Sequence, residues 1–265
     1  MTTQAKADTL VIIPMYNEKE NAAAIIDAVL VLDTPFDILV IDDNSPDGTA
    51  AIVREKMGEH PGRVDIIERA GKLGLGTAYI EGFRWGLAHG YEYICEMDAD
   101  FSHNPNDLPR LRQALVSGQG DVAIGSRYLT GVNVVNWPMG RVLMSYYASK
   151  YVRIVTCLVG SEMCIRDRHV RDTTAGFVCY RADVLRAMNL DAIHFKGYAF
   201  QIEMKYTAHV LGFRITEVPI VFVNRVLGTS KMNSGIFGEA LFGVIKLKWW
   251  GATGRIKKRH AAARQ

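Results

Sequence analysis

Residues 91–100 read Tyr-Glu-Tyr-Ile-Cys-Glu-Met-Asp-Ala-Asp, and this stretch decides the fold. The apolar run over 91–97 predicts a buried strand, and Asp98 and Asp100 follow at the point where the run ends. Side chains at i and i+2 of an extended chain point to the same side, so both carboxylates are expected to converge just beyond the strand. In open α/β sheets, ligands bind at this carboxyl edge.

The two carboxylates supply hard oxygen ligands and leave room for water and phosphate oxygens, which suits Mg2+ or Mn2+ better than zinc. Taken alone, the pair is a weak signal, because many acidic pairs in loops only meet solvent or cap a helix. Residues 10–18 and 38–48 strengthen it, since each is a buried-strand pattern that ends in a polar turn. Three strands are therefore predicted to deliver polar or acidic groups to one edge of a parallel sheet.

Strand and helix patterns alternate along the chain. They predict strands near residues 9–14, 37–42, 63–68, 91–97 and 121–125, with helices near 18–32, 46–58, 77–89 and 106–117. Ser45 followed by Pro46 is typical of a helix start. Beyond Trp137 the pattern loosens, and it predicts helices near 140–156, 181–188 and 198–211 with strands at 174–180 and 213–223. The alternation indicates an α/β fold with a mostly parallel central sheet and flanking helices.

The 265 residues are enough for one large domain, and no linker-like stretch divides them. The polar start leads into an apolar run that is too short for a signal peptide, which predicts a cytoplasmic protein. No segment approaches the roughly twenty apolar residues that span a bilayer. The best candidate, residues 236–250, is interrupted by Glu239, Lys246 and Lys248.

The C-terminal segment, residues 233–249, is predicted to be an amphipathic helix with Phe237, Leu241, Val244 and Leu247 roughly on one face. With Trp249 and Trp250 beside lysines, it fits a helix that lies in a membrane interface. Packing against the core explains the same pattern equally well. The last twenty residues carry seven basic side chains and no acid, and such a tail meets solvent, an anionic membrane or nucleic acid.

Residues 157–168 show neither helical nor strand periodicity. The codons GTG GGC TCG GAG ATG TGT ATA AGA GAC, from a transposase adapter used in sequencing libraries, encode residues 159–167. We therefore interpret the segment as a sequencing-adapter artefact; a genuine surface insertion is the alternative, and resequencing the locus decides between them. Cys157 and Cys164 lie in this segment, whereas Cys95 and Cys179 lie in apolar runs and are expected to be reduced core thiols.

Several separated blocks of this sequence resemble the inverting glycosyltransferases of the GT-A fold, and most closely the dolichyl-phosphate or polyprenyl-phosphate mannose synthases. The blocks are residues 14–18, 42–48, 72–78, 98–105, 125–128, 172–177 and 196–203, with Asn224-Arg225 and Ser230-Lys231. The resemblance implies a GT-A (Rossmann-like) domain over residues 8–232, followed by the interfacial helix and basic tail over 233–265. Residues 72–79 depart from both the dinucleotide fingerprint and the P-loop, and the stretch 72–76 ahead of the predicted helix is expected to form a loop near the donor phosphates or the acceptor.

The resemblance also implies roles for individual residues. The donor's base and ribose would contact Pro14, Tyr16, Glu18, Ile41 and Asp43. Asp98, Ala99 and Asp100 would hold the donor diphosphate through Mg2+ or Mn2+, with Asp98 and Asp100 as metal ligands. Arg127, Arg225 and Lys231 match the family's phosphate-binding cations, and Arg127 joins Asp98 and Asp100 as a catalytic residue. Some members of the family have glutamine as a further metal ligand where this chain has Ser102.

The implied reaction is inverting transfer of mannose from GDP-mannose to a polyprenyl phosphate, giving a β-linked lipid phosphomannose. The acceptor phosphate, with a second pKa of about 6, is largely ionised at neutral pH and needs no general base. The expected partners are GDP-mannose, the lipid acceptor and the cytoplasmic face of a membrane, without nucleic acid. Two alternatives stay open: the same chemistry with UDP-glucose or another nucleotide sugar, and a non-enzymatic nucleotide or nucleic-acid binder with a basic tail.

Overall fold

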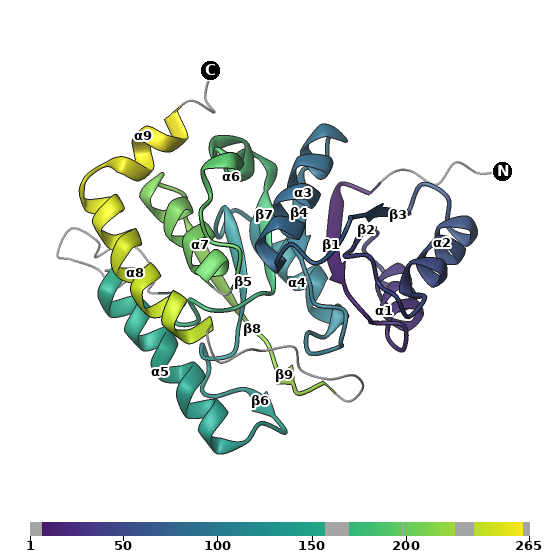
Figure 1. The fold of residues 1–265 in the computed structure, drawn as a ribbon, viewed down its shortest axis with the longest axis horizontal. Coiled ribbons are helices and arrows are strands. Elements are labelled where there is room, and N and C mark those ends of the chain that lie inside the picture. Colours follow the sequence, from purple (N-terminus) through teal and green to yellow (C-terminus); the bar gives the residue numbers. More distant parts are fainter. Residues whose placement is uncertain (1–6, 157–169, 198, 226–235, 262–265) are drawn as a thin grey trace.

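A seven-stranded sheet forms the centre of the computed structural model, which describes residues 7–156, 170–197, 199–225 and 236–261. Its strands run in the order β3-β2-β1-β4-β7-β5-β8 (Figure 1). Their bounds are β1 (Thr9–Met15), β2 (Asp37–Asp42), β3 (Val64–Glu68), β4 (Tyr93–Glu96), β5 (Val122–Ser126), β7 (Val178–Arg181) and β8 (Ile215–Pro219). Only β7 is antiparallel to its neighbours in this sheet. The predicted α/β fold with a mostly parallel sheet is confirmed.

Helices cover both faces of the sheet because the strands are apolar on both sides. Val11 and Ile13 contribute to one apolar cluster, whereas Leu10 and Ile12 contribute to another, as expected from the two-residue alternation of a strand. The first cluster is completed by α1 (Ala22–Leu30), α2 (Thr49–Glu59) and α4 (Leu108–Val116). The second is completed by α3 (Leu75–Ala88), α6 (Ala182–Ala187) and α7 (Ala199–Val210).

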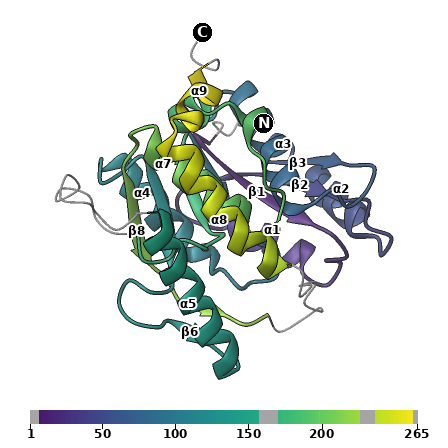
Figure 2. The same cartoon turned by 60° about the vertical axis from the view of Figure 1, so that its left-hand side comes forward.

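A further layer of helices packs outside α7. It contains α5 (Met139–Thr156), α8 (Ile236–Ala252) and α9 (Arg255–Ala261), and Figure 2 shows α5 and α8 side by side. A third apolar cluster joins these helices to α7, with Tyr206 of α7 among its members. Two short strands, β6 (Val134–Val135) and β9 (Phe222–Val223), pair in parallel near the start of α5, and short 3-10 turns lie at Pro105–Asp107 and Leu190–Ala192.

Several element boundaries differ from the sequence prediction: the first helix, expected from residue 18, begins at Ala22, and three other regions also differ. Residues 213–223 form two strands, because β8 ends at Pro219 and the chain then turns away to pair with β6. The second helix begins at Thr49, since Ser45 donates its hydroxyl to Asp42 instead of capping a helix. The strand expected at 174–180 begins only at Val178.

The apolar face of the C-terminal helix α8 that was expected to meet either a membrane or the core packs against the core. Val244 and Leu247 are fully buried in the third cluster, so core packing is the correct explanation for them. A different stripe is exposed, formed by Phe242, Ile245 and Trp249. Within the described ranges no helix is long and apolar enough to cross a bilayer. The side chains of Phe237 and Leu241, the proposed domain boundary at 232/233 and the whole 157–168 segment lie outside the described residues.

Candidate active site

The carboxyl ends of β1, β2, β4 and β5 lie at one edge of the sheet, because these strands are mutually parallel. In the register, Met15 lies opposite Asp42, and Ile12 lies opposite Glu96. The segments that follow β1 and β2 remain hydrogen-bonded to each other, because the Asp43 amide donates to the Met15 carbonyl at 3.0 Å. The predicted convergence at one edge of three strand ends followed by polar or acidic groups is therefore confirmed.

Asp98 and Asp100 occupy the loop directly after β4. Asp100 is buried, and its Oδ1 accepts the backbone amide of Ser102 at 3.0 Å. A left-handed backbone at Phe101, with φ of 58°, turns the chain so that this contact forms. Burial and the neighbouring Asp100 carboxylate raise the pKa of Asp98 to about 7. Ser102 thus contributes a backbone amide to the acidic pair rather than a further carboxylate or amide oxygen.

Opposing charges from distant parts of the chain reach this pair. Arg225, which follows β9, places Nη2 3.0 Å from Asp100 Oδ2. The charges of Arg225 and Arg127 lower the pKa of Asp98, while that of Glu18 raises it, so the four side chains share one electrostatic environment. The predicted contribution of Lys231 lies outside the described residues.

His103 lies beneath the acidic loop. Its ring stacks on Phe177 with the centroids 4.8 Å apart, and the Asp98 amide approaches His103 Nδ1 at 3.4 Å. Burial lowers the pKa of His103 to about 4, so the imidazole is neutral and can accept that amide. The histidine is therefore a neutral support for the loop rather than a charged group.

The loops that follow β1 and β2 are tied together beside the acidic pair. The Asn17 amide donates to Ser45 Oγ at 3.0 Å, and the Glu18 amide donates to Thr49 Oγ1 at the same distance. Tyr16 is half-buried, and the ammonium of Lys72 lies 5.2 Å from the centre of its ring. This contact places Lys72 next to a residue expected to meet the donor, and the predicted loop is short because α3 already begins at Leu75.

The side chains of the other predicted donor residues lie at the same edge with different exposure. Pro14 is half-buried and lies opposite Ile41 in the register. Ile41 and Ala99 are buried within the apolar clusters, so a ligand would meet them through backbone atoms. Pro14, Ile41 and Ala99 therefore lie at the site, but their positions do not define a specific contact with the donor.

Arg69 is a site residue that the sequence analysis missed. It follows β3, and its Nε donates to Asp43 Oδ1 at 2.6 Å, while its Nη1 donates to Thr77 Oγ1 at 2.8 Å. Both Arg69 and Asp43 are buried, and burial raises the pKa of Asp43 despite the guanidinium. Because Arg69 directly follows a predicted strand, the sequence could have indicated that it lies at the same edge as the site. Only the strand order β3-β2-β1 shows that it neighbours Asp43.

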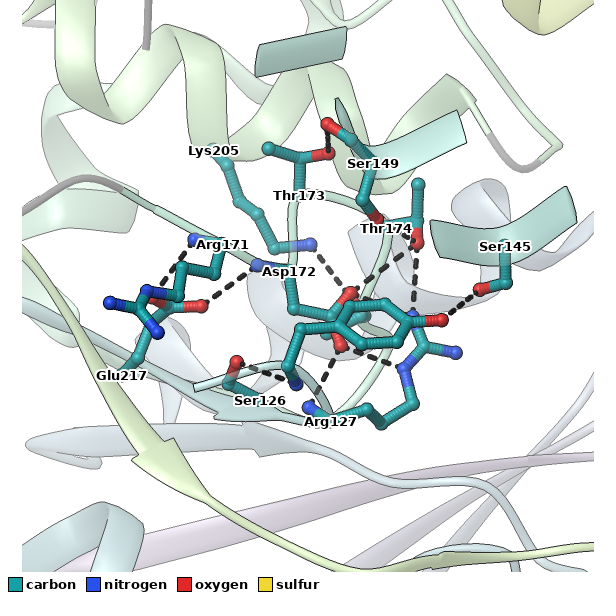
Figure 3. A network of polar contacts seen from close by, with 12 residues as sticks. Ser126, Arg127, Ser145, Ser149, Arg171, Asp172, Thr173, Thr174, Lys205 and Glu217 are labelled. Carbon is teal, nitrogen blue, oxygen red and sulfur yellow. Dashed lines mark hydrogen bonds and ion pairs between the residues drawn. The ribbon is translucent and has the colours of Figure 1, made fainter. Parts of the chain in front are cut away.

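Arg127, just past β5, is held by Asp172 across a buried interface (Figure 3). Asp172 Oδ2 accepts Nε of Arg127 and Oδ1 accepts Nη2, both at 2.7 Å, and the Arg127 amide also donates to Oδ2 at 3.0 Å. Burial alone would raise the pKa of Asp172, but the charge and hydrogen bonds of Arg127 outweigh it and hold this pKa below its usual value.

The acidic pair fits a divalent cation bound together with a diphosphate. No group of three or more His, Cys, Asp or Glu side chains suited to a metal occurs within the part of the chain that the structure describes. Two carboxylates with remaining positions for water and phosphate oxygens match the way Mg2+ is usually held at phosphate-transfer sites. Burial, and then the repulsion of the neighbouring Asp100 carboxylate, raise the pKa of Asp98, and a bound cation would offset both effects.

The chain belongs to glycosyl transferase family 2, whose model matches residues 10–187. It is 43% identical over 263 residues to the polyprenol monophosphomannose synthase of Mycolicibacterium smegmatis, covering 99% of this chain and 94% of that protein. It is 46% identical over 246 residues to the undecaprenyl-phosphate mannosyltransferase of Micrococcus luteus, with 93% and 95% covered. The expected family is confirmed, and with it the enzyme class of glycosyltransferases.

Solved structures share the fold at low sequence identity. The glucosyl-3-phosphoglycerate synthase of Mycobacterium tuberculosis, solved with Mn2+, UDP-glucose and glycerol 3-phosphate, matches with a TM-score of 0.63, 17% identity, and 92% of this chain and 79% of that chain covered. A mannosyltransferase from Pyrobaculum calidifontis, solved with GDP-mannose and Mn2+, matches with a TM-score of 0.55, 17% identity, and 98% and 74% covered. These likenesses confirm the glycosyltransferase fold.

Proposed function

We propose that this chain transfers mannose from GDP-mannose to a polyprenyl phosphate with inversion, giving β-linked polyprenyl phosphomannose. The carrying observation is the convergence of Asp98 and Asp100 with Arg127 and Arg225 at one sheet edge, in a chain whose near-full-length relatives are named for mannose transfer to polyprenyl phosphates. The mannosyltransferase that shares the fold was solved with GDP-mannose.

The chain's own residues have distinct tasks in this reaction. An oxygen of the acceptor phosphate attacks C1 of mannose, the bond from C1 to the donor phosphate breaks, and GDP leaves with the electron pair. Asp98 and Asp100 would hold Mg2+ or Mn2+, which stabilises the negative charge on the leaving diphosphate. Arg127 and Arg225 contribute fixed positive charge for the phosphates, with Arg127 suited to a directed contact.

The acceptor's chemistry explains why alignment suffices. A phosphate monoester with a second pKa of about 6 is already largely ionised at pH 7, so no side chain has to remove a proton. Holding the attacking oxygen, C1 and the leaving oxygen in line can lower the activation free energy by several kcal/mol. The Tyr16 ring beside Lys72, and Asp43 beside Arg69, would hold the nucleoside end of the donor.

The enzyme would act while bound peripherally to the cytoplasmic face of a membrane. The exposed stripe of α8, formed by Phe242, Ile245 and Trp249, supports this proposal. The guanidinium of Arg255 lies 4.3 Å from the ring centre of Trp249, so aromatic surface and positive charge occur together. This combination suits the interface of an anionic bilayer.

Transfer of labelled sugar into butanol-extractable lipid tests the function. The full chain, and a chain lacking residues 157–168, would be supplied with polyprenyl phosphate, Mg2+ or Mn2+, and either GDP-mannose or UDP-glucose, with Asp100→Ala as the inactive control. Metal-dependent mannolipid supports the proposal. Glucolipid alone would overturn the donor, and no lipid product from a folded protein that still binds GDP would overturn the acceptor. Nucleotide or nucleic-acid binding without any transfer would favour a binding protein.

A further inference from the structure

The buried pair of Arg127 and Asp172 joins the proposed site to a segment that has no assigned role. Asp172 is fully buried and Arg127 is 8% exposed. Asp172 engages Arg127 through Nε, Nη2 and the backbone amide, which fixes both the plane of the guanidinium and the position of its main chain. A long arginine side chain would otherwise sample many rotamers, and ordering it upon ligand binding would reduce affinity.

The segment that carries Asp172 is itself held at both ends. At its start, the Glu217 carboxylate on β8 accepts the amides of Arg171 and Asp172 at 2.9 and 2.8 Å. At its end, the buried ammonium of Lys205 on α7 donates to the Ala175 carbonyl at 2.5 Å. Two charged side chains from different elements therefore fix a short loop, and this loop carries Asp172 (Figure 3).

A third element fixes the outer side of the guanidinium. Arg127 Nη2 donates to Thr174 Oγ1 at 2.9 Å, and Thr174 Oγ1 lies 3.1 Å from Ser149 Oγ on α5. The adjacent Thr173 points elsewhere, with its hydroxyl toward the Ser149 carbonyl at 3.4 Å. Arg127 is thus oriented by partners from the 172–174 loop, which is in turn braced by α5, α7 and β8.

Stability alone is a poor explanation for this arrangement. A buried ion pair loses hydration on both sides, and well-packed apolar residues of similar volume are often equally stable. What a doubly hydrogen-bonded carboxylate provides is a fixed direction for the arginine. Asp172 is also more than forty residues from Arg127 in sequence, so only the folded chain creates the pair.

We propose that Asp172 is a positioning residue that sets the guanidinium of Arg127 for contact with the donor diphosphate, while Lys205 and Glu217 hold the loop that carries it. The phosphate contact rests on the proposed function, whereas the orientation of Arg127 does not. Side chains that orient a ligand-binding group through hydrogen bonds typically contribute about 10- to 100-fold to affinity at metal sites, and a similar size is expected here.

Two measurements on the full chain test the proposal. Calorimetric titration with GDP and Mn2+ compares wild type, Asp172→Asn, Arg127→Lys and the double variant. We expect each single change to weaken GDP binding about tenfold or more, and the double change to add little to either. The second measurement follows the Nε–H resonance of Arg127 in the nucleotide-free protein, which should be protected from exchange in wild type and lose protection in Asp172→Asn.

The adjacent threonines supply a matched pair if Asp172→Asn does not fold. Thr174→Val removes a hydrogen bond to Arg127, whereas Thr173→Val removes one to a helix carbonyl. Only Thr174→Val should weaken GDP binding and the exchange protection of the Arg127 Nη2 protons, which donate to Thr174. Equal effects of the two threonine changes, additive losses in the double variant, or an unchanged Nε–H resonance would each overturn the positioning role. A wild-type protein that binds neither GDP nor UDP would overturn the proposed function, while the Nε–H resonance would still decide the role of Asp172.

Discussion

Arg225 Nη2 lies 3.0 Å from Asp100 Oδ2, so one of the two proposed metal ligands is paired with a cation of the chain itself. This contact crosses from the loop after β4 to the residue that follows β9. A divalent cation and the Arg225 guanidinium would compete for the same carboxylate. When a diphosphate binds, its oxygens would interact with both the divalent cation and the Arg225 guanidinium.

Replacing Arg225 should therefore strengthen metal binding while weakening nucleotide binding. We expect Arg225→Gln to bind Mn2+ several-fold more tightly in the absence of nucleotide, because the charge that partly neutralises Asp100 is gone. Binding of GDP in the presence of Mn2+ should fall about tenfold or more. Electron paramagnetic resonance of unbound Mn2+ measures the first effect. Arg214→Gln, which alters an exposed pair with Asp121, is the control; equal Mn2+ affinity in both variants would contradict the competition.

The Arg69–Asp43 pair should govern recognition of the nucleoside. Arg69→Met leaves the Asp43 carboxylate buried without its cation, so a larger share of Asp43 will be protonated and its orientation will be lost. We expect GDP affinity to fall about tenfold and the preference for GDP over UDP to narrow. Titration with both nucleotides provides the measurement. Arg54→Met, which removes an exposed pair with Glu68, should leave both affinities unchanged.

The exposed apolar stripe of α8 should be required for membrane attachment. Phe242→Glu with Trp249→Glu adds negative charge to two side chains that are 73% and 51% exposed, so folding should be preserved. We expect binding to vesicles containing anionic lipid to fall about tenfold or more. Co-sedimentation of the protein with these vesicles measures the bound fraction. Val31→Glu with Val116→Glu changes two exposed residues on the opposite side of the sheet and should bind like wild type; a loss shared by both double variants would argue against α8.

Gly76 should be indispensable for packing rather than for phosphate binding. A Cβ at this position would lie 2.7 Å from the ring of Phe200, where α3 meets α7. We expect Gly76→Ala to destabilise the fold by about 1–3 kcal/mol, as overpacking of a core does. Gly58→Ala in α2 meets no atom within 4 Å and should stabilise the fold by up to about 1 kcal/mol. Denaturant unfolding compares the two; equal stabilities would mean that α3 and α7 separate easily.

Acid should weaken the C-terminal helices through His260. Burial, and then the charge of Arg259, lower its pKa from 6.5 to about 4, and the neutral ring accepts the Asn189 amide at 2.9 Å. The unfolded chain therefore binds more protons between these values, so this stabilisation is complete above pH 6.5 and is lost as the pH falls toward 4. Melting temperatures measured from pH 7.5 to 5 should fall less steeply for His260→Gln than for wild type. Parallel curves would exclude His260 as the cause.

Much of the architecture could be predicted because its signals are local. The apolar runs that form β1, β2 and β4 identify buried strands, and the polar or acidic residues that follow them identify the edge where these strands end. Helix and strand boundaries were less accurate where a tertiary contact competes with a local preference. Ser45 is the clearest case, since it bonds Asp42 and the helix starts at Thr49.

The sequence by itself determined the α/β alternation, the acidic pair and the family, because each depends on residues close together in the chain. Only the tertiary structure decided which cation holds which carboxylate. Arg69 meets Asp43, Arg127 meets Asp172 and Arg225 meets Asp100 across strands and loops whose adjacency follows from strand order. Likewise, the pattern of α8 predicted one apolar face that either a membrane or the core could cover, and the packing of Val244 and Leu247 against α7 and α5 decided for the core. Periodicity is a property of neighbours in sequence, whereas charge pairing and burial depend on neighbours in space.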